Sequence, residues 1–299
     1  MAEITTQQLA ELLIGIARSQ QAVIDAIESA QAGFKAKHLS PTLQAAAKLR
    51  SMDYVATLQD LPDAPRFVIN ATNVQSGVLW RFMKTAMRDY RVGSIERPTV
   101  RLADAVAASS AFPPVLSPFE IRVDPNAFVP GSGQDLQRPP FTSKLVLSDG
   151  GVYDNLGLET VWKRYDTVLV SDGGGKSQAQ EEPKSDWARH SYRVLDLIDN
   201  QVRSLRKRQL IDSYDSGARR GSYWGIRTDI GDYGLADALD CPFERTTELA
   251  ETPTRLKRMD DALQERLINW GYAVCDAALR KHVDREISKP RGFPYPRGV

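Results

Sequence analysis

Two aspartates followed by glycines are the residues of this chain best suited to chemistry. Asp149 stands in the string SDGGVYDNLG, and Asp172 stands further along in SDGGG. A carboxylate beside glycines can orient or activate a nucleophile, bind a divalent metal ion, or cap a following helix. The glycines also let backbone N–H groups point toward an anion. Asp-Gly-Gly alone is common in ordinary turns, so the longer string around Asp149 is the more specific of the two.

Short apolar, β-branched runs precede both aspartates, at 145–147 and 167–170, and apolar residues recur at helical spacing between them, over 155–165. This order of strand, glycine turn, helix and strand predicts a βαβ crossover with a buried parallel sheet. Each aspartate would then lie at the carboxyl end of a strand, where open α/β sheets bind ligands. Neighbouring strands could bring the two carboxylates together to bind a metal or share a proton. We interpret Asp172 as a structural turn residue, because no further ligands cluster near it in sequence. A nucleotide or phosphate site on the turn 173–175 ranks lower, because no Gly-x-Gly-x-x-Gly or Walker pattern accompanies it.

Composition argues against several function classes. Hydrophobic residues make up 42% of the chain and charged residues 26%, as in ordinary soluble proteins, and the net charge of +1 gives no reason to expect nucleic-acid binding. The two cysteines and three scattered histidines predict no disulfide framework, no metal site and no cofactor. The polar N-terminus does not resemble a signal peptide, and no apolar run could span a bilayer. These features predict a cytoplasmic protein and leave peripheral membrane contact open.

Residues 5–34 are predicted to form one long amphipathic helix. Apolar residues alternate there in steps of three and four, as in a coiled-coil seam, with one polar interruption at Gln20. The simplest interpretation is a helix packed on its own domain; self-association as a homo-oligomer and docking to a partner are the alternatives. We divide the chain accordingly into an N-terminal helical segment, residues 1–50, and a larger domain, residues 51–299.

The rest of the chain alternates between further strands, helices and loops. Residues 77–91 fit either a hairpin or an irregular helix. The alanine-rich stretch 101–110 predicts a helix, in which we interpret Ser109 and Ser110 as small residues at its end. The basic run RSLRKR, at 203–208, is interpreted as a solvated helix face, with contact to anionic phospholipid head groups as the alternative. The other predicted elements are strands at 66–72, 119–123 and 222–228, helices at 189–211 and from Thr252-Pro253 to Val283, and loops at 124–140 and 178–186.

One protein family shares the most specific of these motifs. The string SSAFPP at 109–114, followed by DGGVYDN at 149–155, resembles the C-terminal half of a patatin-like phospholipase domain, as does the segment 67–93. The similarity extends from roughly Tyr54 to the C-terminus. It implies an α/β fold, a three-layer α/β/α domain with a mostly parallel central sheet, that hydrolyses acyl esters of phospholipids or other lipids with a Ser-Asp dyad. The resemblance further implies that Asp149 is the catalytic aspartate and that Gly150, Gly151 and Asn155 bind the substrate.

The chain departs from that family at the nucleophile. The family's serine lies in a Gly-x-Ser-x-Gly elbow, and a glycine-rich loop near the start of its domain supplies the oxyanion hole. No Gly-x-Ser-x-Gly string occurs in the 299 residues, and the predicted long helix occupies the place of both elements. We therefore expect a patatin-like domain that is incomplete at its N-terminal side, with little or no esterase activity in this chain alone. Two explanations are open. The chain is a truncated or rearranged phospholipase, or it is a pseudoenzyme. Such a pseudoenzyme would bind lipid, or would bind a protein partner through the N-terminal helix.

Overall fold

The structure is a computed structural model that describes residues 56–114, 116–175, 177–253 and 258–299. The chain divides into two compact units, Met1–Val55 and Ala56–Val299, and all described residues belong to the second unit. The helix predicted at residues 5–34 therefore lies outside the described residues. The division of the chain near residue 50 into a helical segment and a patatin-like domain stays a prediction.

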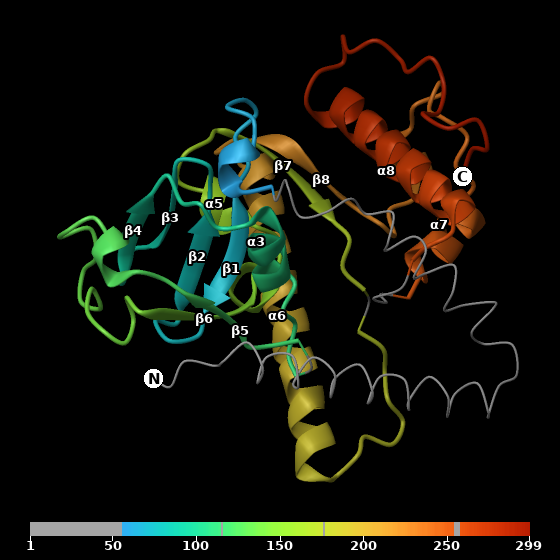
Figure 1. The fold of residues 1–299 in the computed structure, drawn as a ribbon. Helices are drawn as coiled ribbons and strands as arrows, with labels where there is room; N and C mark the ends of the chain where they lie inside the picture. Colours follow the sequence, from blue (N-terminus) through green and yellow to red (C-terminus); the bar gives the residue numbers. More distant parts are fainter. Residues whose placement is uncertain (1–55, 115, 176, 254–257) are drawn as a thin grey trace, which may run out of the picture. The chain divides into compact units, whose positions relative to one another are not determined.

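Six strands form an antiparallel sheet in the order β4-β3-β2-β1-β6-β5 (Figure 1). Residues 77–91, which fitted either a hairpin or a helix, form the β2–β3 hairpin. β1 and β6 are neighbouring interior strands of the sheet, and their register places Ala71 opposite Asp149. The strands predicted at 66–72 and 119–123 are confirmed as β1 and β5, with small shifts of their ends. The bounds of the six strands are β1 Ile69–Asn73, β2 Val78–Phe82, β3 Ala86–Asp89, β4 Gly93–Glu96, β5 Phe119–Arg122 and β6 Lys144–Asp149.

A short helix of small residues packs on the central strands of this sheet. α3 (Leu102–Ser109) contacts β1, β5 and β6, and its buried Ala105 and Ala108 permit a close approach. The helix predicted at 101–110 is thereby confirmed. Burying a large apolar side chain in such a core contributes about 1.5–3 kcal/mol relative to leaving it exposed. The largest fully buried side chains of this core are Trp80, Phe82, Leu58, Leu145 and Leu147.

The predicted parallel pairing of the two Ser-Asp strands is wrong, and so is the mostly parallel central sheet. β6 pairs in antiparallel fashion with β1 on one edge and with β5 on the other, so neither edge is left for the strand that follows it. The connection, residues 150–166, is long enough for a parallel crossover, so the occupied edges of β6 are what exclude the pairing. The helix expected over 155–165 is only two short pieces, α4 (Gly151–Asp154) and α5 (Leu158–Val161), separated at Gly157, whose φ is 68°.

A parallel βαβ unit does exist, one element further along the chain. β7 (Thr167–Asp172) pairs in parallel with β8 (Arg220–Gly225), and α6 (Trp187–Asp215) connects them. The helix predicted at 189–211 is thus confirmed and is longer at both ends. The strand predicted at 222–228 is β8, which begins and ends earlier. It ends at Gly225 because the Gly225 N–H donates to the Thr228 hydroxyl at 2.9 Å and closes a turn there.

The basic run of α6 is only partly a solvated face. Arg206 forms an ion pair of 2.8 Å with Glu159, and the Lys207 ammonium lies 4.3 Å from the centre of the Tyr223 ring. Among the apolar residues of α6, Leu210 alone is fully buried. None of the helices in the described part of the chain has the apolar length that crossing a bilayer requires.

A second core lies at the C-terminal side of β8. It joins the short turn η4 (Ile230–Tyr233) to α7 (Phe243–Ala250) and α8 (Asp261–His282). The predicted start of the last helix at Thr252-Pro253 is wrong, because α8 begins at Asp261. Asp260 caps it, since its carboxylate accepts the N–H of Leu263 at 2.9 Å. The buried apolar residues of α8 recur at helical spacing, at Trp270, Ala273, Val274, Ala277 and Ala278.

Candidate functional site

Asp149 is the last residue of β6, and the backbone of its turn is held from two segments, β1 and residues 109–111. Its N–H donates to the Ala111 carbonyl at 2.9 Å, and its own carbonyl accepts the Thr72 hydroxyl at 2.8 Å. The next N–H, that of Gly150, donates to the Ser109 carbonyl at 3.1 Å. The SSAFPP segment at the end of α3 is therefore bonded directly to the Asp-Gly-Gly turn.

The tight turn after Asp149 requires glycine. A Cβ on Gly150 would lie 2.5 Å from the Asn70 carbonyl oxygen of β1, well inside van der Waals contact. Gly151 has more space, and its nearest neighbour would be the Asp149 carboxylate itself at 3.0 Å. The neighbouring strand thus explains why a residue without a side chain follows the aspartate.

The Asp149 carboxylate is fixed through one oxygen. Its Oδ1 accepts the Gly151 N–H at 2.7 Å, and Oδ2 has no hydrogen bond to any residue that the structure describes. Burial raises the pKa of this carboxyl, the Gly151 N–H opposes that rise, and the charge of Asp199 on α6 adds to it. An oriented carboxylate with one free oxygen and a raised pKa is suited to accept a proton from a hydroxyl.

This carboxylate faces a cavity of about 440 Å³ whose walls come from β1, α3 and the β6–α4 turn. The cavity brings together all four residues expected to form a site, because Asp149, Gly150, Gly151 and Asn155 line it. Asn155 is less available than expected, since its amide nitrogen donates to Asp199 at 3.2 Å.

A comparison with protein families covers this part of the chain. Residues 18–162 match the family model of the patatin-like phospholipases. The resemblance inferred from SSAFPP and the Asp-Gly-Gly string is therefore confirmed. Its predicted extent, from roughly Tyr54 to the C-terminus, is wrong, because the match begins at residue 18 and ends at residue 162. Searches of curated proteins and of solved structures gave no significant match. The matched patatin-like segment includes β1, α3 and the whole Asp149 turn, and it ends before β7.

Sequence reasoning missed three polar residues in the cavity beside Asp149: Asn70, Ser109 and Asp154. Ser109 had been interpreted as a small helix-end residue, although the SSAFPP string already marked its position. Asp154 is 4% exposed; its Oδ2 accepts the Glu159 N–H at 2.6 Å, and its Oδ1 has no partner among the described residues. Asn70 could not be found from its own surroundings in sequence, because only strand pairing brings β1 beside β6.

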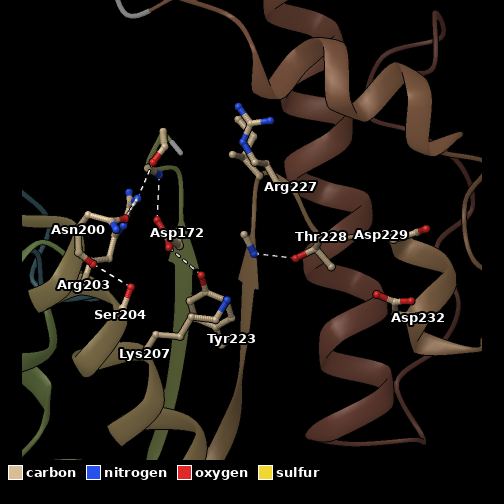
Figure 2. Close-up of a pocket in the computed structure, with 14 residues that line it drawn as sticks. Asp172, Asn200, Arg203, Ser204, Lys207, Tyr223, Arg227, Thr228, Asp229 and Asp232 are labelled. Atoms are coloured by element: carbon tan, nitrogen blue, oxygen red, sulfur yellow. Dashed lines mark hydrogen bonds between the residues drawn. The ribbon is translucent and has the colours of Figure 1, made fainter. Parts of the chain in front are cut away.

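Asp172 lies outside the patatin-like segment and is not brought near Asp149 by sheet pairing. Its Oδ1 accepts the Gly174 N–H at 2.8 Å, and its Oδ2 accepts the Tyr223 hydroxyl at 2.7 Å (Figure 2). Both oxygens are therefore occupied, as its interpretation as a turn residue would require. Across the described ranges, no group of three His, Cys, Asp or Glu side chains is arranged to hold a metal ion.

Proposed function

We propose that this chain derives from an enzyme that hydrolyses acyl esters of lipids, in which Asp149 is the carboxylate partner of a serine nucleophile. In such a reaction the serine oxygen attacks the ester carbonyl carbon and passes its proton to the carboxylate. The proton then goes to the departing alcohol, and water hydrolyses the acyl-enzyme. The observation that carries the proposal is the Asp149 carboxylate, which is oriented by the Gly151 N–H and has its second oxygen free at a cavity.

We further propose that the chain by itself hydrolyses such esters weakly or not at all. The sequence contains no Gly-x-Ser-x-Gly string, so no nucleophile elbow accompanies the aspartate. Removing the nucleophile from a serine hydrolase lowers the rate by about 10⁴-fold or more. The second candidate function is therefore lipid binding without hydrolysis, for which the cavity beside Asp149 provides the space.

A labelling experiment separates these functions. The 299-residue chain would be incubated with a p-nitrophenyl ester and with a fluorophosphonate probe that reacts with activated serines. We expect turnover near the background and no stoichiometric labelling. Labelling that disappears in Asp149→Asn would contradict the proposed inactivity and would support the role of Asp149 as partner of a serine. The matched control is Asp172→Asn, which changes the same residue type in the second Ser-Asp-Gly-Gly turn.

The binding alternative needs its own measurement. A non-hydrolysable ether analogue of a lysophospholipid should bind the wild-type chain, and Asp149→Asn should change its affinity while Asp172→Asn should not. Equal affinities for all three proteins would exclude the cavity beside Asp149 as the binding site.

Self-association through residues 5–34, peripheral membrane contact and a cytoplasmic location remain predictions. Size-exclusion chromatography with and without residues 1–38 tests the first of them. Elution of both proteins as monomers would exclude oligomerisation through the N-terminal segment.

A further inference from the structure

A second polar pocket, of about 390 Å³, lies at the carboxyl ends of β7 and β8. Figure 2 shows Asp172 and Tyr223 between the α6 residues on one side and residues 227–232 on the other. Open α/β sheets place ligands beyond the carboxyl ends of their parallel strands, and this is the parallel pair in the described part of the chain. The volume suits a small ligand. The pocket is distinct from the Asp149 cavity, and no residue lines both.

Two cations on one face of α6 lack a carboxylate partner. Arg203 and Lys207 are four residues apart, hence one helical turn apart, and both line the pocket. Neither forms an ion pair with any residue that the structure describes. Arg203 donates to the Gly175 carbonyl at 2.5 Å and to the Asn200 side-chain oxygen at 3.5 Å. Lys207 makes a cation–π contact with Tyr223 but no hydrogen bond in the described part of the chain. Most of their N–H donors are therefore free for an acceptor in the pocket.

The three carboxylates that line the pocket, those of Asp172, Asp229 and Asp232, form no ion pair with these two cations. Asp172 is occupied by the Gly174 N–H and the Tyr223 hydroxyl, and Asp229 uses Oδ1 to cap η4 through the Gly231 N–H. Asp232 is exposed on the opposite wall. Thr228 accepts the Gly225 N–H, which leaves its own hydroxyl hydrogen free to donate.

We propose that this pocket binds the phosphate group of a small phosphate ester, held by Arg203 and Lys207. Unpaired guanidinium and ammonium groups side by side form strong charge-assisted hydrogen bonds to phosphate oxygens. The acidic residues Asp229 and Asp232 on the far wall disfavour a ligand with several phosphates, so the site selects a monophosphate over a polyphosphate. A soluble ester or a phospholipid head group could supply this phosphate. The proposal is independent of the role of Asp149.

Isothermal titration calorimetry on the full chain tests the site with inorganic phosphate, glycerol 3-phosphate and inorganic triphosphate as probes. We expect glycerol 3-phosphate to bind, and triphosphate to bind no more tightly. Lys207→Gln and Arg203→Gln should each weaken binding by about 10-fold or more, as expected for loss of a charge-assisted contact. Arg208→Gln is the matched control, because Arg208 is exposed on the same helix outside the pocket. It should change the affinity by less than about 2-fold.

Vesicle binding distinguishes the two sources of phosphate. Association with phosphatidylcholine vesicles that contain phosphatidic acid, lost in Lys207→Gln but kept in Arg208→Gln, together with no binding of glycerol 3-phosphate, would identify a lipid head group. Equal losses in the Lys207 and Arg208 variants, tighter binding of triphosphate, or no binding of any probe would overturn the proposal. If Arg203→Gln fails to fold, the affinity of Lys207→Gln for phosphate still tests the site. Asp149→Asn should bind phosphate as tightly as the wild type.

Discussion

The four residues Ser-Asp-Gly-Gly end two strands of this molecule, and the two copies have different surroundings. In both, the aspartate accepts the N–H two residues further on, at 2.7 Å for Asp149 and 2.8 Å for Asp172. The second oxygen of Asp172 accepts the Tyr223 hydroxyl, whereas that of Asp149 has no hydrogen-bond partner in the described part of the chain. The motif thus determines the turn, and the adjacent strand determines whether the carboxylate is available to a ligand.

The glycines of the two turns differ in the same way. Gly150 lies against the backbone of β1, so that no Cβ fits, while a Cβ on Gly173 would have no atom within 4 Å. β6 is an interior strand with neighbours on both sides, whereas β7 pairs with no strand other than β8 among the described residues. Glycine is therefore required by packing in the Asp149 turn and is optional at the corresponding position of the Asp172 turn.

The largest expected effect on the free energy of unfolding is at the glycines that follow the two aspartates. Gly150→Ala should lower the free energy of unfolding by about 3 kcal/mol, because the new methyl group forces the turn or β1 to move. Gly173→Ala should change it by less than about 0.5 kcal/mol or stabilise the protein slightly, since the site is open and its φ is not positive. Urea denaturation followed by circular dichroism measures both. Similar losses in the two variants would show that the turns are equally constrained.

Much of the fold could be predicted from the sequence because local patterns determine it. The β-branched runs ending at Asp149 and Asp172 are strands, and both glycine turns occur where the motif places them. The patatin-like motifs also identified Asp149 and its two glycines, which do line one cavity. Small alanines marked α3, and the spacing of apolar residues marked α6 and α8.

Strand pairing could not be predicted in the same way. The run at 167–170 is continuously apolar and so suggested a strand buried on both faces, but Leu169 is 48% exposed and only Val168 and Val170 are buried. Nothing local to β6 shows that β1 and β5 occupy its two edges. The Asp149 cavity depends on that pairing, because Asn70 and Ser109 reach it from segments far away in sequence.

A smaller effect on the free energy of unfolding is expected at the hydrogen bond between Tyr223 and Asp172. Tyr223→Phe removes the hydroxyl that Asp172 accepts at 2.7 Å and keeps the ring on which Lys207 lies. We expect a loss of about 1.5 kcal/mol in the free energy of unfolding, as for a hydrogen bond to a charged group. A double-mutant cycle measures the coupling directly. Tyr223→Phe and Asp172→Asn should be non-additive, whereas Tyr223→Phe and Asp149→Asn should be additive; additivity in both cycles would contradict the difference between the two turns.

The smallest effect concerns the proton affinity of Asp149. Burial raises the pKa of this carboxyl above the ordinary value of 3.8, so the folded state binds the proton more tightly than the unfolded chain does. Its contribution to stability is therefore present below pH 3.8 and is lost as the pH rises through the raised pKa. Asp149→Asn should remove this loss, so the variant gains stability relative to the wild type as the pH rises across that window. Urea denaturation at a series of pH values measures the difference.

Asp135 provides the control for the sign of this effect. Arg91 lowers the pKa of Asp135, so that carboxylate contributes stability above the ordinary pKa of 3.8 and loses it as the pH falls. Asp135→Asn should therefore lose stability relative to the wild type as the pH rises, opposite to Asp149→Asn. Slopes of the same sign in both variants would mean that Asp149 is stabilised as a carboxylate in the folded protein. It would then be a weaker base than its burial implies, and the two Ser-Asp-Gly-Gly turns would be more alike than their hydrogen bonds indicate.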